Sequence, residues 1–161
     1  MKIDLTNIPP EGKYIQFNFI PAWWKPDFVD NHIIGLSVPL SGWIKVCLAG
    51  KKVTVEGAFS TILELKCDRC LEPYTEDIST NFRFFLSLLP YEGNLDIELL
   101  EDDLNISFID GKYIDSDQII KEQIILNAPM KTICSDDCKG LCPVCGCNLN
   151  KETCSCSTKA D

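Results

Sequence analysis

Residues 43–55 read WIKVCLAGKKVTV. Apolar side chains recur at every second position, as at Ile44 and Val46, which is the period of a β-strand with one buried face. Gly50-Lys51-Lys52 can turn the chain, and the same period resumes at Val53. The stretch therefore predicts two antiparallel strands joined by a short link.

Further strands are predicted on both sides of this pair. Residues 14–20 alternate apolar and polar side chains. Residues 34–40 do the same, although Pro39 restricts that strand to an edge or a bulge, because proline cannot donate to a strand ladder. A long strand is expected over about 75–89 and a short one over 105–109. Successive strands with short links predict an antiparallel meander.

One main helix is predicted between residues 115 and 127. Asp115 or Ser116 can cap its start, and Ile120 and Ile124 lie four residues apart on an apolar face widened by Ile119, Ile125 and Leu126. Asn127-Ala128-Pro129 should end it, because the residue before a proline disfavours the α conformation. The fold class is thus α+β, an antiparallel β-sheet meander with one main α-helix and a zinc-stapled, cysteine-rich C-terminal knuckle. We expect an α+β sheet domain over 1–130 and a cysteine-rich zinc-binding tail over 131–161 packed on it.

The composition limits the classes of function. The 161 residues carry a formal charge of −9, which disfavours a protein that wraps nucleic acid by bulk positive charge. The chain starts Met1-Lys2-Ile3-Asp4, without the apolar segment of a signal peptide, and no apolar run reaches the roughly 20 residues that span a bilayer. We therefore expect a cytoplasmic, reducing location. In that setting the ten cysteines indicate metal binding rather than disulfides.

The cysteine spacing predicts two four-sulfur sites. Structural zinc favours four thiolates in a tetrahedron, and a Cys-x2-Cys pair can curl around one metal ion. One predicted site is Cys142, Cys145, Cys154 and Cys156, and the other is Cys67, Cys70, Cys134 and Cys138. Two zinc ions per chain follow from four ligands each.

Other arrangements of the cysteines stay open. A single site made of Cys67, Cys70, Cys142 and Cys145 is the main competitor, and an iron–sulfur cluster would also take four cysteines. Cys47, embedded in a strand, is expected to be a small buried apolar residue. Cys147 lies too close to Cys145 to be needed, although it could replace a neighbouring ligand.

Together these strings resemble a known family. They are Cys67-Asp68-Arg69-Cys70-Leu71-Glu72-Pro73, the helix 120–129, Cys134 to Gly146 with its Cys-Lys-Gly-Leu-Cys-Pro-Val-Cys-Gly run, Asn148-Leu149-Asn150, and Cys154-Ser155-Cys156. They strongly resemble the YceD family, the large ribosomal RNA subunit accumulation proteins. The resemblance covers most of the chain, and the N-terminal third matches only in general character.

The resemblance implies a non-enzymatic factor that supports 23S ribosomal RNA accumulation and large-subunit biogenesis. Its partner would be ribosomal RNA or a large-subunit ribosomal protein, and the eight paired or clustered cysteines would be its metal ligands. Two alternatives remain. One is a thiol-disulfide oxidoreductase using Cys67 and Cys70. The other is a protein–protein adaptor whose acidic stretch 91–110, with seven acids and no Lys or Arg, binds a basic ribosomal protein.

The remaining candidates have plain structural interpretations. His32 is the only histidine, so no acid–base constellation can be built on it. Trp23-Trp24 could stack on unpaired bases, but packing on the sheet is the simpler expectation. The five basic residues within 44–69 are expected to be a solvated strand face rather than an RNA-binding patch.

Overall fold

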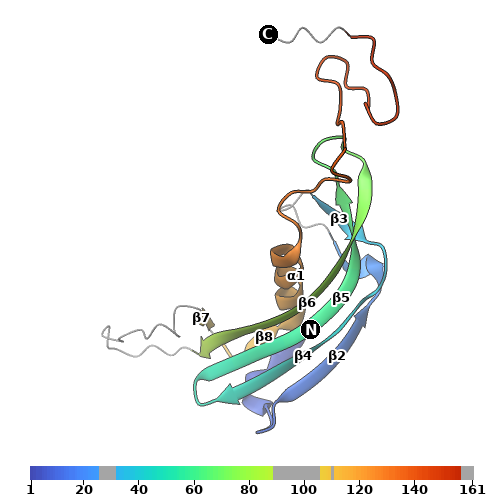
Figure 1. Ribbon diagram of the computed structural model, residues 1–161. Helices are drawn as coiled ribbons and strands as arrows, with labels where there is room; N and C mark the ends of the chain where they lie inside the picture. The colour runs from blue at the N-terminus through green and yellow to red at the C-terminus, as the bar shows by residue number, and fades with distance from the viewer. Residues whose placement is uncertain (26–31, 89–105, 110, 157–161) are drawn as a thin grey trace, which may run out of the picture. The chain divides into compact units, whose positions relative to one another are not determined.

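The computed structural model describes residues 1–25, 32–88, 106–109 and 111–156 (Figure 1). Most of its regular structure is antiparallel β-sheet accompanied by one α-helix, so the expected α+β class is confirmed for the described residues. The elements are β1 (Lys2–Asp4), β2 (Lys13–Phe19), β3 (Ile33–Leu36), β4 (Leu40–Ala49), β5 (Lys52–Lys66), β6 (Pro73–Leu88), β7 (Ile106–Ile109), β8 (Tyr113–Asp115) and α1 (Ser116–Asn127), with short 3-10 turns at Leu5–Asn7 and Pro21–Trp23.

The described chain divides into two compact units. Unit 1 comprises residues 1–18, 41–60 and 79–127, and unit 2 comprises residues 19–40, 61–78 and 128–161. One sheet contains the strands in the order β2-β4-β5-β6-β7, and β3 pairs with β5 outside this order. β5 and β6 contribute residues to both units, because each strand is longer than one core requires.

The sheet of unit 1 forms by the alternation that the sequence predicts. β4 and β5 pair antiparallel in continuous register, from Ser41 opposite Ser60 to Ala49 opposite Lys52. The residues on one face are fully buried, as Ile44, Val46 and Val55 are, and they form the core with α1 and β8. A strand with one buried face has little freedom to slip, since a one-residue shift would expose this whole set.

Helix α1 begins where the sequence predicts. The Asp115 carboxylate accepts the backbone N–H of Asp117 at 3.0 Å and also bonds the Met1 amino group at 3.1 Å. Ile119, Ile120 and Ile124 are buried, whereas Ile125 and Leu126, which were expected on the apolar face, are exposed.

Two pairings differ from the predicted meander. β7 pairs with β6 in parallel, from Phe85 opposite Ile106 to Leu88 opposite Ile109; the sequence predicted this short strand but not its direction. β1 pairs with β8, and neither of these short strands was predicted. Both pairings join segments that are separated in sequence. The local alternation of apolar residues does not indicate which distant strand a segment will pair with.

Unit 2 shows why the predicted strand over 34–40 is interrupted. β3 ends at Leu36, Pro39 follows in a non-strand segment, and β4 starts at Leu40. β3 instead pairs with β5 and carries a bulge between Ile33 and Gly35.

Within the described residues, no helix combines the length and apolarity needed to cross a membrane.

Glycine at position 57 is required by a close approach between neighbouring strands. A Cβ atom there would lie 2.6 Å from Phe82 Cζ and 2.6 Å from the Trp43 carbonyl oxygen. We expect Gly57→Ala to lower the free energy of unfolding by about 1–3 kcal/mol, the usual range for an overpacked core. Urea unfolding measures it. Gly35→Ala is the control, because its Cβ would meet only Glu64 Oε2 at 3.6 Å; an equal loss in both variants would contradict the packing argument.

Candidate metal centres

Two Cys-x2-Cys turns of unit 2 have the same backbone design. In the first, the N–H of Leu71 donates to the Cys67 carbonyl oxygen at 2.9 Å. In the second, the N–H of Gly146 donates to the Cys142 carbonyl oxygen at 2.9 Å. The residue after the second cysteine is left-handed in both turns, with φ of 61° at Leu71 and 74° at Gly146. Each turn thus closes so that both of its sulfurs point to one side.

Backbone amides inside these turns point at the first sulfur. Cys67 Sγ accepts from the backbone N–H groups of Arg69 and Cys70, two and three residues further on. Cys142 Sγ accepts in the same way from the N–H groups of Val144, at 3.4 Å, and Cys145. Amide dipoles aimed at sulfur stabilise a thiolate, which is the form that binds metal.

The first cluster brings together the four sulfurs of Cys67, Cys70, Cys134 and Cys138. Cys67 Sγ lies 3.9 Å from Cys138 Sγ, and Cys70 Sγ lies 3.7 Å from Cys134 Sγ. All four sulfurs lie within 4.8 Å of one another. The turn supplies one pair and the segment after α1 supplies the other, as the spacing predicted.

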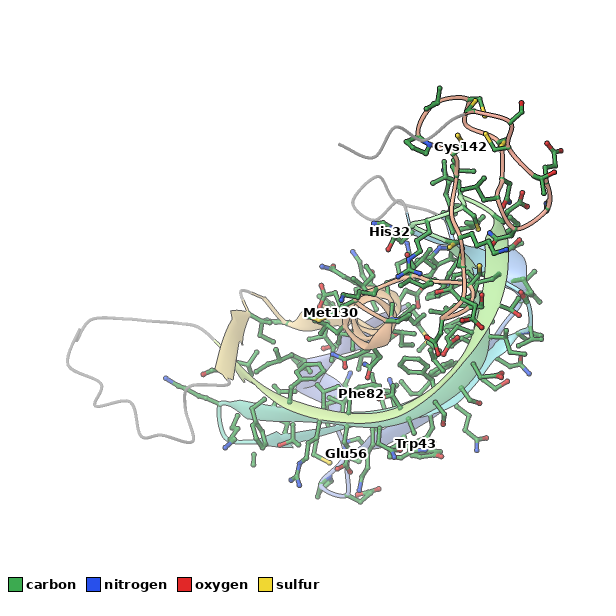
Figure 2. All side chains as sticks on the ribbon, turned by 45° about the horizontal axis from the view of Figure 1, so that its top comes forward. His32, Trp43, Glu56, Phe82, Met130 and Cys142 are labelled. Atoms are coloured by element: carbon green, nitrogen blue, oxygen red, sulfur yellow. The ribbon has the colours of Figure 1, made fainter. Side chains whose placement is uncertain are left out.

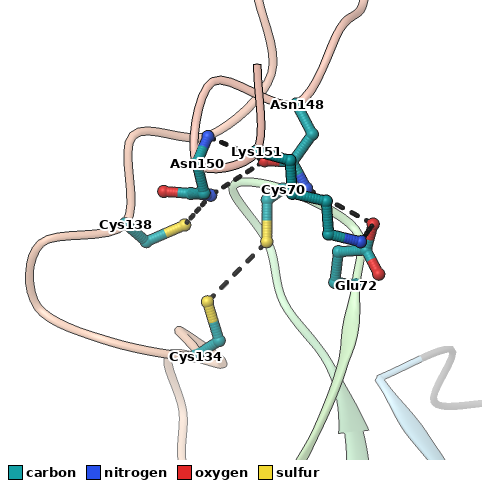
Figure 3. Close-up of polar contacts among 7 residues, drawn as sticks. All are labelled: Cys70, Glu72, Cys134, Cys138, Asn148, Asn150 and Lys151. Atoms are coloured by element: carbon teal, nitrogen blue, oxygen red, sulfur yellow. Dashed lines mark hydrogen bonds and ion pairs between the residues drawn. The ribbon is translucent and has the colours of Figure 1, made fainter.

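Side chains from the 148–151 segment support this first cluster (Figure 3). Asn150 Nδ2 donates to Cys138 Sγ at 3.3 Å, and Asn148 Oδ1 accepts the Asn150 backbone N–H at 3.0 Å. Glu72, just after the Cys67–Cys70 turn, accepts from Asn148 at 3.3 Å and pairs with Lys151 at 2.7 Å. The sequence alone indicates no role for Asn148 and Asn150; two asparagines in a short loop between ligand pairs are the available signal.

The Cys67–Cys70 turn is held by a second set of polar contacts. Asp68 accepts the backbone N–H of Thr132 at 3.1 Å and contacts His32 Nδ1 at 3.0 Å. Hydrogen bonding by Thr132, followed by the smaller effect of His32, lowers the pKa of Asp68. Arg69 reaches the carbonyl oxygen of Cys138 at 3.1 Å. His32, the only histidine of the chain, thus lies beside the Asp68 carboxylate and the Thr132 hydroxyl.

The second cluster is formed by Cys142, Cys145, Cys154 and Cys156, whose sulfurs also lie within 4.8 Å of one another. Cys154 Sγ is 3.3 Å from Cys142 Sγ and 3.5 Å from Cys145 Sγ. The backbone N–H of Cys156 donates to Cys154 Sγ at 3.2 Å. This cluster is more exposed than the first, in which Cys67, Cys70 and Cys138 are buried.

Protons are distributed unevenly within each cluster. Although burial opposes ionisation, the backbone amides of Cys70, Cys134 and Arg69 lower the pKa of Cys67 to about 6. The Cys147 amide leads the contacts that lower the pKa of Cys145 to about 6. Thiol hydrogen bonds to Cys138 and Cys154 raise the pKa values of Cys134 and Cys156, respectively, to about 12. Filling either cluster with metal would therefore release protons.

The two remaining cysteines belong to neither cluster among the described residues. Cys47 lies in β4 and is half-buried, with its sulfur beneath Gly12. Cys147 is half-buried, and its carbonyl oxygen accepts the N–H of Cys142 at 2.8 Å.

Both clusters fit zinc better than disulfides. Four sulfurs about 2.3 Å from a tetrahedral zinc ion would be about 3.8 Å apart. The sulfur–sulfur contacts of 3.9 and 3.7 Å in the first cluster match that spacing, and those of 3.3 and 3.5 Å in the second are slightly shorter. A disulfide would require about 2.05 Å. Eight thiols in two compact groups of four are therefore suited to hold two metal ions.

Comparisons with known proteins identify relatives. A sequence model described as "Large ribosomal RNA subunit accumulation protein YceD" matches residues 55–161. A chloroplastic YCED homolog 1 of Arabidopsis thaliana is 33% identical over 141 residues, covering 73% of this chain and 44% of the relative. The Zea mays homolog is 30% identical, covering 67% and 44%.

A more distant relative is an uncharacterized protein of Mycobacterium tuberculosis, 28% identical over 109 residues, covering 68% of this chain and 51% of the relative. The chain thus spans about half the length of the curated relatives it matches. No solved structure matches it.

Substituting the left-handed residue that follows the second cysteine in each turn tests their shared backbone design. Leu71 is left-handed and 50% exposed, so Leu71→Gly should remove strain while losing little buried contact. We expect it to raise the free energy of unfolding by about 1 kcal/mol, and Gly146→Ala to lower it by about the same amount. A Cβ at position 146 meets no atom within 4 Å, so only backbone strain would destabilise the Gly146→Ala variant. Urea unfolding in the presence of zinc measures both; changes of the same sign would contradict the shared design.

Proposed function

Because the chain belongs to the YceD family, we propose that it is a non-enzymatic factor of large ribosomal subunit biogenesis that supports 23S ribosomal RNA accumulation. The observation that carries the proposal is the family match over residues 55–161, a range that includes all eight clustered cysteines. The names of the plant relatives refer to accumulation of the large ribosomal RNA subunit. Its partner would be ribosomal RNA or a large-subunit ribosomal protein.

We further propose that the eight cysteines hold two structural zinc ions. Cys67, Cys70, Cys134 and Cys138 would hold one, and Cys142, Cys145, Cys154 and Cys156 the other. Four protein sulfurs complete a tetrahedral shell, so zinc would supply cross-linking and charge neutralisation without an open position for a reactant. In this proposal residues 131–161 form a zinc-binding tail on an α+β domain of residues 1–130.

Burial disfavours the thiol oxidoreductase alternative. Cys67 is 0% and Cys70 4% exposed, so a substrate disulfide has no approach to either sulfur. Their turn leads into β6 rather than into a helix, whose N-terminus would favour a reactive thiolate. The adaptor alternative rests on residues 91–110, most of which lie outside the described residues.

We propose that the protein is located in the compartment that contains the ribosomes whose assembly it supports. The sequence favours a cytoplasmic location, whereas the named plant relatives are chloroplastic. A bacterial or organellar interior satisfies both, because each holds ribosomes and keeps thiols reduced.

Metal analysis tests the zinc assignment. Protein purified under reducing conditions with zinc supplied should contain about two zinc ions per chain. Cys67→Ser and Cys142→Ser should each retain about one ion, because each variant removes a ligand from only one cluster. Cys47→Ser, whose sulfur belongs to neither cluster, should keep both. Loss of all zinc from either ligand variant would favour a shared single site, and no zinc in the wild type would contradict the assignment.

Depletion tests the biological role. Cells depleted of the protein should lose 23S relative to 16S ribosomal RNA, and a wild-type or Cys47→Ser copy should restore the ratio. Quantitative RNA analysis and ribosome sedimentation measure it. An unchanged ratio after full depletion would contradict the proposed role. Capture of ribosomal proteins with and without RNase would identify an adaptor that needs no RNA.

A further inference from the structure

The sheet of unit 1 has a solvent side that the cysteine clusters do not use. We define the outer face by the side chains of Tyr14, Trp43, Lys45, Lys52, Glu56, Arg83 and Phe85. In β4 and β5 these residues alternate with the fully buried Ile44, Val46, Val53 and Val55. In β6, Arg83 and Phe85 alternate with Phe82 and Phe84, which pack on the core. Trp43 and Glu56 accordingly project from the side of the sheet opposite to Phe82 (Figure 2).

Two aromatic groups lie on this outer face. Tyr14 of β2 and Trp43 of β4 stack with ring centroids 5.5 Å apart and planes inclined by 23°. Tyr14 is 54% exposed. The partner of Trp43 across the β4–β5 ladder is Ala58, a small residue that covers little of an indole ring. Flat π surfaces of this kind are available for stacking by a further planar group.

The second group combines an aromatic ring with cations. Lys52 Nζ lies 4.1 Å from the centroid of the Phe85 ring, and the Arg83 guanidinium carbon lies 5.6 Å from it. Both cationic side chains are exposed, and their contacts with the Phe85 ring hold them on the outer face. Cation–π contacts order long basic side chains that would otherwise sample many rotamers.

The charge of the outer face is opposite to that of the chain. It carries the three basic side chains Lys45, Lys52 and Arg83 and one carboxylate, Glu56, which lies 4.0 Å from Lys45. The whole chain has a formal charge of −9. The outer face thus combines a positive excess with the rings of Tyr14, Trp43 and Phe85, although the chain as a whole is acidic.

We propose that the outer face binds single-stranded RNA, with bases stacked on the Tyr14–Trp43 pair and phosphates contacted by Lys45, Lys52 and Arg83. Stacking on aromatic side chains and contacts from basic groups are the two components of single-strand binding. A duplex hides its base faces and an acidic peptide would use only the cations, so neither uses the whole surface. This inference rests on the proposed function and specifies the partner directly contacted.

Neither Tyr14 nor Trp43 lies within the matched family region, which starts at residue 55. The Tyr14–Trp43 pair therefore lies outside the range on which the family match rests. The basic excess within residues 44–69 was expected to be a solvated strand face. Lys45 and Lys52 from that range do lie on the solvent side, but in combination with aromatic residues from β2, β4 and β6.

Fluorescence anisotropy tests the proposal with the full-length, zinc-loaded protein and an unstructured fluorescein-labelled 12-nucleotide RNA. Tyr14→Ala combined with Trp43→Ala should raise Kd about tenfold or more, and the Tyr14→Phe, Trp43→Phe pair should restore most of the affinity. Lys52→Ala combined with Arg83→Ala should reduce the slope of log Kd against log salt by about 0.7 per lost phosphate contact. Glu56→Gln should tighten binding. Double-stranded RNA should bind more weakly than the single strand.

Two matched controls guard against general effects. Tyr113→Ala removes a 58% exposed aromatic ring of unit 1 that is not on the outer face, and Lys112→Ala removes an exposed cation beside it. Both should leave Kd unchanged. Circular dichroism should show that the alanine variants fold, and ultraviolet crosslinking should place RNA on peptides that contain Tyr14 or Trp43.

The proposal is overturned if the wild-type protein does not bind the RNA, if the outer-face variants bind it as the wild type does, or if crosslinks map only to the cysteine clusters. Its failure is distinguishable from failure of the proposed function. If a Tyr14→Ala, Trp43→Ala copy restores 23S RNA in depleted cells, the surface is wrong and the role stands. If depletion leaves 23S RNA unchanged, the role is wrong, and anisotropy still decides whether this face binds RNA.

Discussion

Convergence of sulfur atoms from distant parts of the chain is the constraint on which the C-terminal structure depends. Within the part of the chain that the structure describes, the small buried group of Cys67, Cys70 and Cys138 has two partly buried apolar neighbours, Tyr74 and Ile133. A segment with so little apolar surface cannot offset the entropy of ordering its backbone by burial alone. Cross-linking of the four thiolates by the proposed zinc ion would supply what the missing core would otherwise provide.

The two clusters are linked by contacts from the loop that separates the ligand pairs of the second. Asn150, which precedes Cys154, donates to Cys138 of the first cluster, and Lys151 pairs with Glu72 beyond the first turn. The N–H of Leu141 in turn bonds the Arg69 carbonyl oxygen at 3.0 Å. These contacts join the loop of the second cluster to residues around the first cluster, while each cluster keeps its own four sulfurs.

Features set by local chemistry could be predicted from the sequence, and features set by distant partners could not. Period-two alternation indicated β4 and β5, and Asp115 with Pro129 bounded α1. The cysteine spacing predicted the same two groups of four that the structure brings together, although their metal content stays a prediction. The parallel β6–β7 pair, the β1–β8 pair and the hydrogen bond from Asn150 to Cys138 all join residues remote in sequence. The left-handed Leu71 was missed because that conformation is typical of glycine.

Charge separates the two proposed tasks of the chain. Four thiolates around a divalent zinc ion leave about two negative charges, so each filled cluster would repel phosphate. Two cations beside the first cluster are committed to protein contacts, since Arg69 binds the Cys138 carbonyl oxygen and Lys151 binds Glu72. On the outer face of unit 1, by contrast, Lys52 and Arg83 make cation–π contacts with the uncharged Phe85 ring, which leave their charges unneutralised. A structural cluster and an RNA-binding surface therefore have opposite electrostatic requirements, and this acidic chain can meet both only by assigning them to different residues.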